Sequence, residues 1–534
     1  MIKFDINKKY YFFLFLLIYF HILFSLSWIV KNEFPAGHDE PTHIGNFIKF
    51  RNNLSSELNW REKAVNTIFT DVDYPPLFYS VSNLFTSFTE VDFKKLELIS
   101  VLFFLLSIIL VFKIGEYIKD KHLGISAAII YSFYPEMFHY SRVFNLDVFF
   151  TFMVSLLLLW LLKIDLDKFQ NRKNIFLFGV LLGLGMLSKQ CFPVFILGPV
   201  FILIFQLCRQ KRCSRKVIFN LAVCFLIAVL ISMVFYSGYL LLSKRGSNIL
   251  YRMKLIDDIG WYPKTKLMNY FYYIYCLIFE QISPFNFIIF IIGFAIFITS
   301  RSNKKLFLIL WILIPLIVFS GIPSKYDRYT MAYLPAAALM SGYAFSRKKT
   351  GIFFLIIVTI FNVYQYYWTS FASVPAKFNK IVTKLRYLPH KDVDNVFGLL
   401  DRLKEEFGRK EMIIGVITNM RGGIFLDIFN ASKLRNYNYR WVPFLYYDNI
   451  HTFIKNMGDM DAIIYINNSS STQDWPDSES INKSIEDTNF AKVDSKTYLH
   501  ISVDEIEDIV SLKEKLVFRG AVPSSKGNYY IYSR

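Results

Sequence analysis

The stretch that decides the fold is YYFFLFLLIYFHILFSLSWIV at residues 10–30, which is followed by KNEFPAGHDEPTH at residues 31–43. The first part carries no Asp, Glu, Lys or Arg and has about the 20 residues that cross a bilayer. It lacks a small-residue cleavage site, and further apolar runs follow, so we interpret it as a retained anchor. The second part places Asp39 and Glu40 at the bilayer exit, where charged groups are costly and indicate chemistry.

The composition indicates a membrane protein. Of 534 residues, 54% are hydrophobic, and the mean hydropathy is +0.35, whereas soluble domains are about 45–50% apolar. The net charge is +18, but residues 376–534 hold 22 Lys and Arg against 21 Asp and Glu. Almost all of the excess charge therefore lies beside apolar runs, as the positive-inside rule predicts, which argues against a nucleic-acid partner.

The apolar runs predict a polytopic α-helical membrane protein with about 11 transmembrane helices. We expect the spans at residues 10–30, 96–113, 122–138, 146–163, 174–188, 192–208, 217–241, 284–300, 305–322, 331–346 and 351–371. The segment 266–283 is rich in tyrosine and is more typical of a helix at the membrane interface. If it spans instead, the tail changes sides.

Charged loops give the orientation. Basic clusters precede the first span and follow the second, fourth, sixth, eighth and tenth spans, at residues 8–9, 113–121, 168–173, 209–216, 301–305 and 347–349. All six fall on one face, which is then cytoplasmic. We therefore predict an inner (plasma) membrane protein with a cytoplasmic amino terminus and an extracytoplasmic carboxyl terminus.

The chain is expected to form two domains. Residues 1–375 would be the multi-span domain with a long first outer loop at 31–94. Residues 376–534 would be a soluble extracytoplasmic α/β domain, because Met412–Ile417 and Asp461–Ile466 have a buried-strand pattern and a hairpin pattern ends the chain. The tail shows no phosphate-binding glycine loop and no nucleophile elbow.

Candidate site residues lie in the predicted outer loops, with acids early and bases later. They are Asp39, Glu40, His43, Tyr74, Pro75, Arg142, Asp147, Lys189, Lys325, Arg328 and Tyr329. Most have an alternative reading. Asp39 or Glu40 could be a helix cap before Pro41, Arg142 with Asp147 an ion pair, and Lys189 a cation that snorkels to the interface. Tyr74–Pro76 could be a rigid turn, and Lys325, Arg328 and Tyr329 could bind lipid headgroups.

A carboxylate base together with cations on one face suits one reaction. A hydroxyl group of an acceptor attacks the anomeric carbon of a sugar carried on a lipid phosphate, the base removes the proton, and the cations neutralise the departing phosphate. Apolar spans would hold the lipid tail, and no nucleotide site is needed.

At these residues the chain resembles the GT-C superfamily of membrane glycosyltransferases, above all the family 39 protein O-mannosyltransferases and the aminoarabinose transferases. The matching pieces are Asp39-Glu40, Tyr74-Pro75-Pro76-Leu77, residues 142–147, residues 183–189 and residues 325–329, in the family's order.

The resemblance implies an inverting enzyme that uses a polyprenyl-phosphate sugar. Asp39, with Glu40 beside it, would be the catalytic base. Arg142, Lys189, Lys325, Arg328 and Tyr329 would hold the donor phosphate, while His43, Tyr74, Pro75 and Asp147 would support the site. The acceptor is a lipid, a glycan or a protein, although the tail lacks the repeat domain of the eukaryotic enzymes, so a protein is not implied. His38 and His43 leave a divalent cation open, but we predict no metal site.

Two other functions stay open from the sequence. The first is a transporter or flippase for a lipid-linked glycan, which would place charges within the spans, whereas the charges here gather at the span ends. The second is a noncatalytic envelope assembly protein whose tail binds partners. Incubating labelled polyprenyl-phosphate sugar with the purified protein separates the three.

Overall fold

The computed structural model describes residues 6–33, 35, 39–70, 74–87, 92–163, 171–209, 215–242, 268–302, 304–322, 325–346, 348–372, 387–389, 396–408, 411–418, 438–443, 462–467, 517–524 and 527–533. The chain divides into two units. The first comprises Met1–Asn32 and Lys49–Pro389, and the second comprises Glu33–Ile48 and His390–Arg534. The start of the first predicted outer loop thus groups with the tail.

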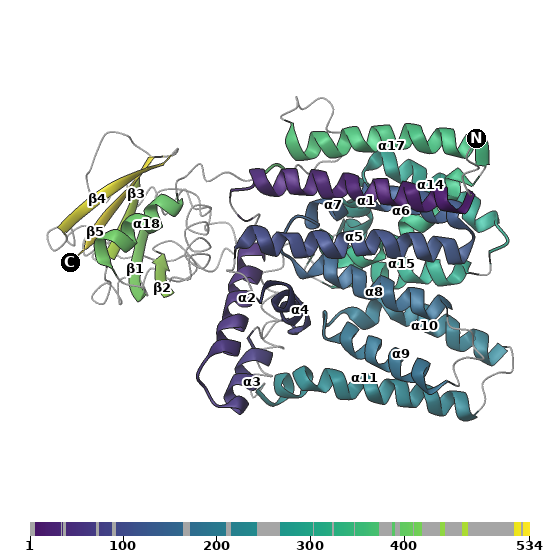
Figure 1. Cartoon of the computed structure of the whole chain (residues 1–534), viewed down its shortest axis with the longest axis horizontal. Coiled ribbons are helices and arrows are strands. Elements are labelled where there is room, and N and C mark those ends of the chain that lie inside the picture. Colours follow the sequence, from purple (N-terminus) through teal and green to yellow (C-terminus); the bar gives the residue numbers. More distant parts are fainter. Residues whose placement is uncertain are drawn as a thin grey trace. The chain divides into compact units, whose positions relative to one another are not determined.

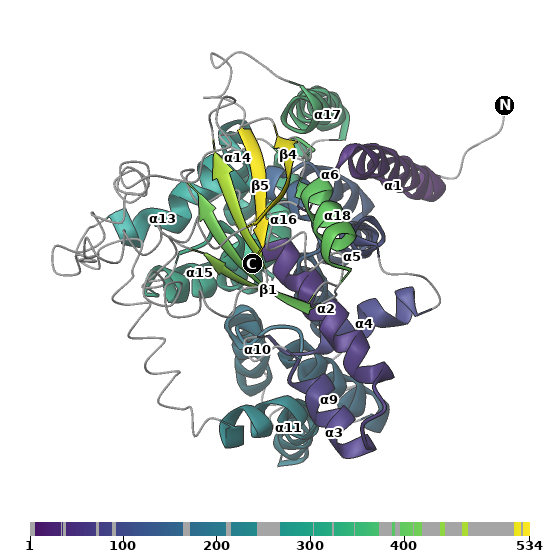
Figure 2. The ribbon, with the colours of Figure 1, turned by 90° about the vertical axis from the view of Figure 1, so that its left-hand side faces the viewer.

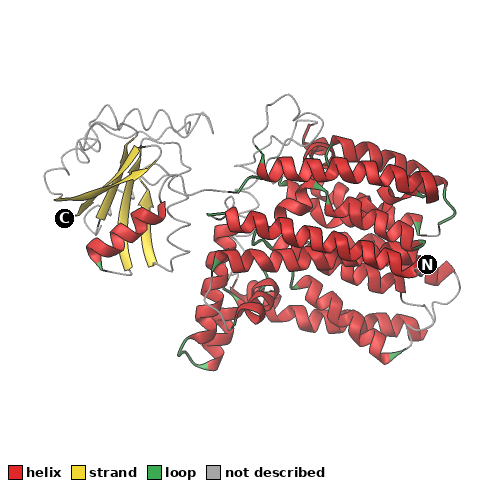
Figure 3. Cartoon of the chain, turned by 45° about the horizontal axis from the view of Figure 1, so that its top comes forward, coloured by secondary structure: helices red, strands yellow, loops and turns green. Residues whose placement is uncertain are grey.

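The first unit is a bundle of helices (Figures 1 and 3). Its amino-terminal half contains α1 (Ile6–Lys31), the end of α2 (Asp39–Ser55), α3 (Trp60–Ile68), α4 (Leu77–Thr86), α5 (Phe93–Ile118), α6 (Lys121–Ser132), α7 (Pro135–Tyr140) and α8 (Leu146–Lys163). The predicted span 122–138 is broken between α6 and α7, since Pro135 has no backbone N–H to continue the helix.

The rest of the first unit contains α9 (Arg172–Met186), α10 (Phe192–Arg209), α11 (Arg215–Leu242), α13 (Met268–Cys276), the π-helical turn η3 (Leu277–Gln281), α14 (Pro284–Thr299), α15 (Lys305–Ser320), the 3₁₀ helix η4 (Asp327–Tyr333), α16 (Leu334–Gly342), η5 (Tyr343–Phe345) and α17 (Lys348–Phe371). Helices α9, α10 and α11 gather at one side, and α1 lies beside α17 at the other (Figures 1 and 2). Phe24 of α1 contacts Tyr366 and Phe371 of α17.

The protein is a multi-pass membrane protein. Among the described residues, α1, α5, α8, α11 and α17 are each long and apolar enough to cross a bilayer. The pair α13–η3 and α14 passes the same test together but is bent by 112°. The bend follows Ser283, whose φ of 74° is rare for a residue with a side chain. A helix covers each predicted span, but the number of 11 crossings stays a prediction.

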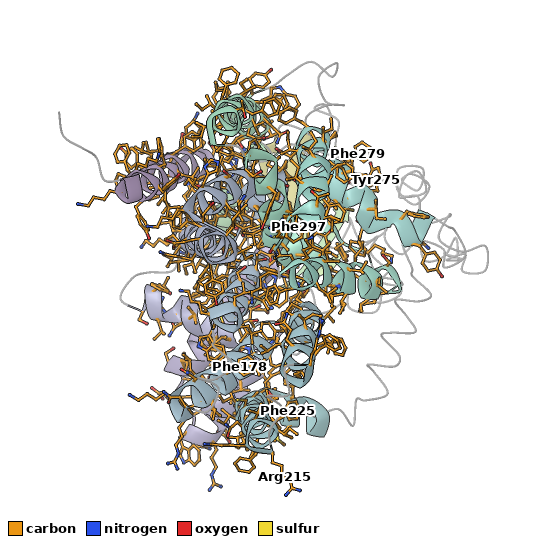
Figure 4. The ribbon with its side chains drawn as sticks, turned by 90° about the vertical axis from the view of Figure 1, so that its right-hand side faces the viewer. Phe178, Arg215, Phe225, Tyr275, Phe279 and Phe297 are labelled. Atoms are coloured by element: carbon orange, nitrogen blue, oxygen red, sulfur yellow. The ribbon has the colours of Figure 1, made fainter. Side chains whose placement is uncertain are left out.

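Polar contacts between α1 and α5 show which predicted basic clusters lie at the same end of the bundle. At one end, Tyr11 of α1 donates to Glu116 of α5 (3.3 Å), and Lys113 donates to the same carboxylate (2.9 Å). At the other end, Lys94 of α5 donates to the carbonyl of Val30 (3.2 Å). Basic clusters at the chain start and after α5 therefore meet at the first end. Figure 4 views this end, and Arg215 extends outward there from the start of α11.

Helices α5 and α6 pack with unusually close backbones. A Cβ atom on Gly115 would lie 2.7 Å from the Cα atom of Gly124. Small residues allow such approach, which stabilises helix pairs in a bilayer through close packing.

The second unit holds the beginning of α2, the helix α18 (Val396–Phe407) and a five-stranded sheet of order β2-β1-β3-β5-β4. The strands are β1 (Glu411–Thr418), β2 (Asn438–Pro443), β3 (Ala462–Asn467), β4 (Val517–Ser524) and β5 (Gly527–Ser533). Strand β1 pairs in parallel with β2 and β3, while β5 is antiparallel to β3 and β4. Buried side chains of α18 are Val396, Leu399, Leu400 and Leu403.

Candidate active site

Asp147 is the centre of the candidate site. It lies in the first turn of α8, where its backbone N–H donates to the side-chain oxygen of Asn145 (3.0 Å). This cap fixes the first turn of α8 and thereby the position of the Asp147 carboxylate. The side chain of Asp147 is only 2% exposed. The carboxylate pairs with Nζ of Lys189 and lies 3.4 Å from Nε of Arg328. Three segments far apart in sequence therefore meet at one buried carboxylate.

Lys189 reaches Asp147 from the turn between α9 and α10. The turn is tight because Gly185 lies against the ring of Phe192, and a Cβ atom there would be 2.1 Å from that ring. Burial lowers the pKa of Lys189, but the adjacent Asp147 carboxylate outweighs it, so that the pKa is raised above its usual range. Lys189 is therefore a permanent cation in this site.

Arg328 is positioned by η4, which Gln281 holds in place. The side-chain amide of Gln281 donates to the carbonyl of Asp327 (2.8 Å) and to the hydroxyl of Thr330 (2.9 Å). The Asp327 carboxylate accepts from the backbone N–H of Arg328 (2.8 Å). The guanidinium lies 5.9 Å from the centre of the Tyr329 ring, and Nζ of Lys189 lies 5.4 Å from the same ring. Tyr329 thus stands between the two cations.

Tyr74 completes the group. It precedes α4 in the turn Tyr74-Pro75-Pro76, in which Pro75 is buried. Burial raises the pKa of Tyr74, and the charges that act on it are those of Lys189, Asp147, Tyr329 and Arg328. The phenol is therefore a neutral hydrogen-bonding group beside the charged cluster.

Lys189 and Arg328 both face the one carboxylate of Asp147 in a buried place. Two neighbouring cations with several N–H donors are the groups that bind a phosphate, so the cluster suits an anionic ligand. Within the described residues, no group of three His, Cys, Asp or Glu side chains is arranged to hold a metal ion.

Lys325 has a structural partner. Its Nζ donates to the carbonyls of Phe319 (2.9 Å) and Ser320 (2.7 Å) at the end of α15. Burial lowers the pKa of Lys325. A cation that satisfies the last carbonyls of a helix has fewer protons to offer a phosphate. We therefore leave Lys325 out of the group that faces the anion.

Arg142 lies in a different place from the one expected. Its guanidinium is fully buried, 4.7 Å from the ring of Trp28, 5.4 Å from that of Tyr366 and 5.6 Å from that of Phe138. The alternative of an Arg142–Asp147 ion pair was wrong, because Asp147 pairs with Lys189 and Arg328. The structure does not bring Arg142 together with the other phosphate-binding candidates.

Asp39 and Glu40 of the first outer loop belong to the second unit. Glu40 and His43 are buried in α2, where they are 0% and 3% exposed. Asp39 is the first residue of α2, but its side chain and all of His38 lie outside the described residues. The role of Asp39, Glu40 and His43 in the site stays a prediction from the sequence.

The sequence did not point to several buried polar residues nearby. Glu136 is fully buried, and Asp327, Glu280, Asp147 and Arg328 are the charges that act on it. Tyr387 lies in the same environment although it comes from the segment after α17. A lone Glu beside Pro135 could have been noticed as a charge at a span end, whereas nothing in the sequence around Tyr387 marks it.

Comparisons with known proteins bear on the fold that holds these residues. A family model described as dolichyl-phosphate-mannose-protein mannosyltransferase matches residues 73–236, which contain Tyr74, Asp147 and Lys189. The structure of ArnT from Cupriavidus metallidurans bound to undecaprenyl phosphate matches with a TM-score of 0.61 and 12% identity, covering 97% of each chain. The resemblance to the GT-C superfamily is confirmed.

A second GT-C structure gives the same fold. The archaeal oligosaccharyltransferase AglB from Archaeoglobus fulgidus, in complex with an inhibitory peptide and a dolichol-phosphate, matches with a TM-score of 0.53 and 13% identity, covering 86% of this chain and 70% of that one. No curated protein sequence matches the chain. At these identities the structural matches establish the GT-C fold, and the chemistry is argued from the residues.

Proposed function

We propose that the protein is an inverting glycosyltransferase that moves a sugar from a polyprenyl-phosphate donor to a hydroxyl group of an acceptor. The observation that carries the proposal is the buried cluster of Lys189, Arg328 and Asp147 in a GT-C fold. We infer that this cluster binds the donor phosphate on the extracytoplasmic side of the inner membrane. The ArnT match was solved with undecaprenyl phosphate and the AglB match with a dolichol-phosphate, which supports the same class of donor here.

The cations fit the charge that develops in the reaction. The donor phosphate is a diester with one negative charge. When the bond between the anomeric carbon and the phosphate oxygen breaks, polyprenyl phosphate leaves with a second charge. Two buried cations stabilise that second charge more strongly than they stabilise the donor, which is the requirement for lowering the barrier. Asp147 holds Lys189 and Arg328 apart and oriented.

The proton of the acceptor needs a base. We assign this role to Asp39, with Glu40 beside it, as the resemblance implies. The base removes the hydroxyl proton while the acceptor oxygen attacks the face of the sugar opposite the phosphate, so the anomeric centre inverts. His43 of α2 is the nearby supporting residue, and no metal is required for these steps.

The test uses purified protein in nanodiscs with radiolabelled undecaprenyl-phosphate sugars and membrane extract as the source of acceptor. Asp39→Asn is expected to lower the transfer rate by about 100- to 10,000-fold and to leave binding of undecaprenyl phosphate unchanged. Glu40→Gln reports whether the neighbouring acid shares the role. Transfer by Asp39→Asn at the wild-type rate contradicts the assignment of the base.

The same assay separates the other functions. A flippase would move the labelled lipid across a vesicle membrane without releasing polyprenyl phosphate, and an assembly protein would do neither. Release of the sugar from its phosphate, together with a labelled acceptor, is the outcome that the proposed transferase predicts. The acceptor, which is a lipid, a glycan or a protein, is identified from the labelled product.

A further inference from the structure

Tyr387 belongs to the first unit and lies in the short described segment 387–389 that follows α17. Its ring stacks on the His139 ring at 3.6 Å between centres and 16° between planes. Its carbonyl accepts from the indole N–H of Trp28 (2.7 Å), and its own N–H donates to the carbonyl of Thr369 (2.9 Å). Contacts with α1, α7 and the end of α17 therefore fix both the backbone and the ring of Tyr387.

The hydroxyl of Tyr387 has no comparable partner. The residue is 8% exposed, and its Oη atom has no hydrogen-bond partner among the described residues. Its ring stacks on His139 of α7, the helix that also carries Glu136, and the groups that act on it electrostatically are Asp327, Tyr140, Glu136 and Glu280. A buried phenol held at three points but left without a partner at its polar end is an expensive arrangement.

Glu136 has the same deficiency. It is 0% exposed, and neither Oε1 nor Oε2 has a hydrogen-bond partner among the described residues. It comes from α7, which packs against η3 and η4, while Tyr387 comes from a distant part of the chain. Two independent segments thus present unpaired oxygen atoms to the same polar region.

Asp327 differs, because its carboxylate already accepts from a backbone N–H group. Its backbone neighbour is Arg328 of the proposed phosphate cluster. Asp147 and Arg328 both act on Glu136. The unpaired oxygens therefore adjoin the place where the donor phosphate would bind, and a group attached to that phosphate can reach them.

Unpaired oxygens need donors, and the chemistry of the residues limits what can supply them. Within the described part of the chain, no group of His, Cys, Asp or Glu is arranged for a metal ion. A lipid tail has no O–H or N–H groups to give. A sugar ring carries several O–H groups directed outward from a compact frame, and it is attached to the phosphate in the proposed donor.

We propose that Glu136 and Tyr387 form the subsite that binds the sugar ring of the donor, each accepting or donating one hydrogen bond with a polar ring substituent. This inference rests on the proposed function. It makes Tyr387, which lies between the membrane helices and the sheet in sequence, a specificity-determining residue.

The experiment compares bare and sugar-bearing lipids. Affinities of undecaprenyl phosphate and of a panel of undecaprenyl-phosphate sugars, with neutral and amino sugars, are measured for wild type, Tyr387→Phe and Glu136→Gln in nanodiscs. Both substitutions keep the shape of the side chain. We expect the sugar-bearing lipid that wild type binds best to lose about 3- to 10-fold in affinity with Tyr387→Phe and about 10-fold or more with Glu136→Gln. Bare undecaprenyl phosphate should bind all three proteins equally.

Tyr131→Phe is the control, since Tyr131 of α6 is also a fully buried phenol, but its neighbour is Ser107 of α5. It should change neither affinity. The subsite is refuted if Tyr387→Phe and Glu136→Gln weaken both lipids equally or neither of them, or if no sugar raises affinity in wild type. Failure of wild type to bind bare undecaprenyl phosphate would instead refute the proposed function.

Discussion

Replacing Lys189 and Asp147 together should destabilise the protein by less than the sum of the two single replacements. The two side chains are 9% and 2% exposed, so a single replacement leaves the partner as a buried charge. Breaking a buried ion pair from one side costs about 3–5 kcal/mol. The loss of stability in Lys189→Met should be near the lower value, because Nε of Arg328 still lies 3.4 Å from the Asp147 carboxylate. The loss of stability in Asp147→Asn should be near the upper value, because the cations of Lys189 and Arg328 then lose the carboxylate between them.

In the double variant Lys189→Met/Asp147→Asn, neither of the two charges is left buried without the other. We expect its free energy of unfolding to fall by about 2 kcal/mol less than the sum of the two single losses. The assay is reversible unfolding by SDS in mixed micelles, followed by tryptophan fluorescence. Lys113→Met is the control: its partner Glu116 is 25% exposed, and such a surface pair contributes about 0–1 kcal/mol.

Additivity would refute this reasoning. If the two single losses sum to the loss of the double variant within about 0.5 kcal/mol, Lys189 and Asp147 do not interact, and the cluster is not the buried, charge-coupled site described above.

Three further outcomes follow from the geometry. Gly185→Ala should lower the free energy of unfolding by about 1–3 kcal/mol, because the added carbon meets the buried ring of Phe192. Gly321→Ala should cost less, because the nearest atom to its added carbon is 3.5 Å away. Thermal unfolding measures both variants. Asn362→Leu breaks a reciprocal amide pair with Asn286 (2.9 and 3.2 Å) and should cost about 0.6–2 kcal/mol in the same measurement. Burial raises the pKa of the Cys191 thiol from 9.0 to about 11. In a variant with Cys191 as the sole cysteine, maleimide labelling at pH 8 should therefore be about 100-fold slower than labelling of an exposed thiol. The labelling rate should rise as the pH approaches 11, and it should fall further when undecaprenyl phosphate is bound.

Much of the fold follows from hydropathy, because each long apolar run has few ways to satisfy its backbone in a bilayer. The sequence also predicted strands at 412–417 and 461–466, and β1 and β3 occupy these segments. It missed β2 at Asn438–Pro443, since a polar segment such as NYRWVP is recognised as a strand only through its pairing with β1.

The site was predicted in part. Tyr74, Asp147, Lys189 and Arg328 share one region, as their placement at one face suggested. Side-chain direction was not readable from the sequence. Arg142 is only five positions before Asp147, yet it turns into an aromatic environment, because the backbone changes from α7 to α8 between them.

Lys325 shows the same limit on a smaller scale. It belongs to the same short motif as Arg328, but its ammonium group satisfies the end of α15. Both residues are cationic and lie within four positions of each other in the sequence. Only the three-dimensional course of the backbone around η4 separates their roles.

The measurement that tests the central claim most directly is a structure of the protein with undecaprenyl phosphate. The account predicts phosphate oxygens at about 3 Å from Nζ of Lys189 or from the guanidinium of Arg328, with Asp147 still between these two cations. A phosphate bound at Arg142, at Lys325 or elsewhere, with Lys189 and Arg328 contacting only Asp147, would contradict it.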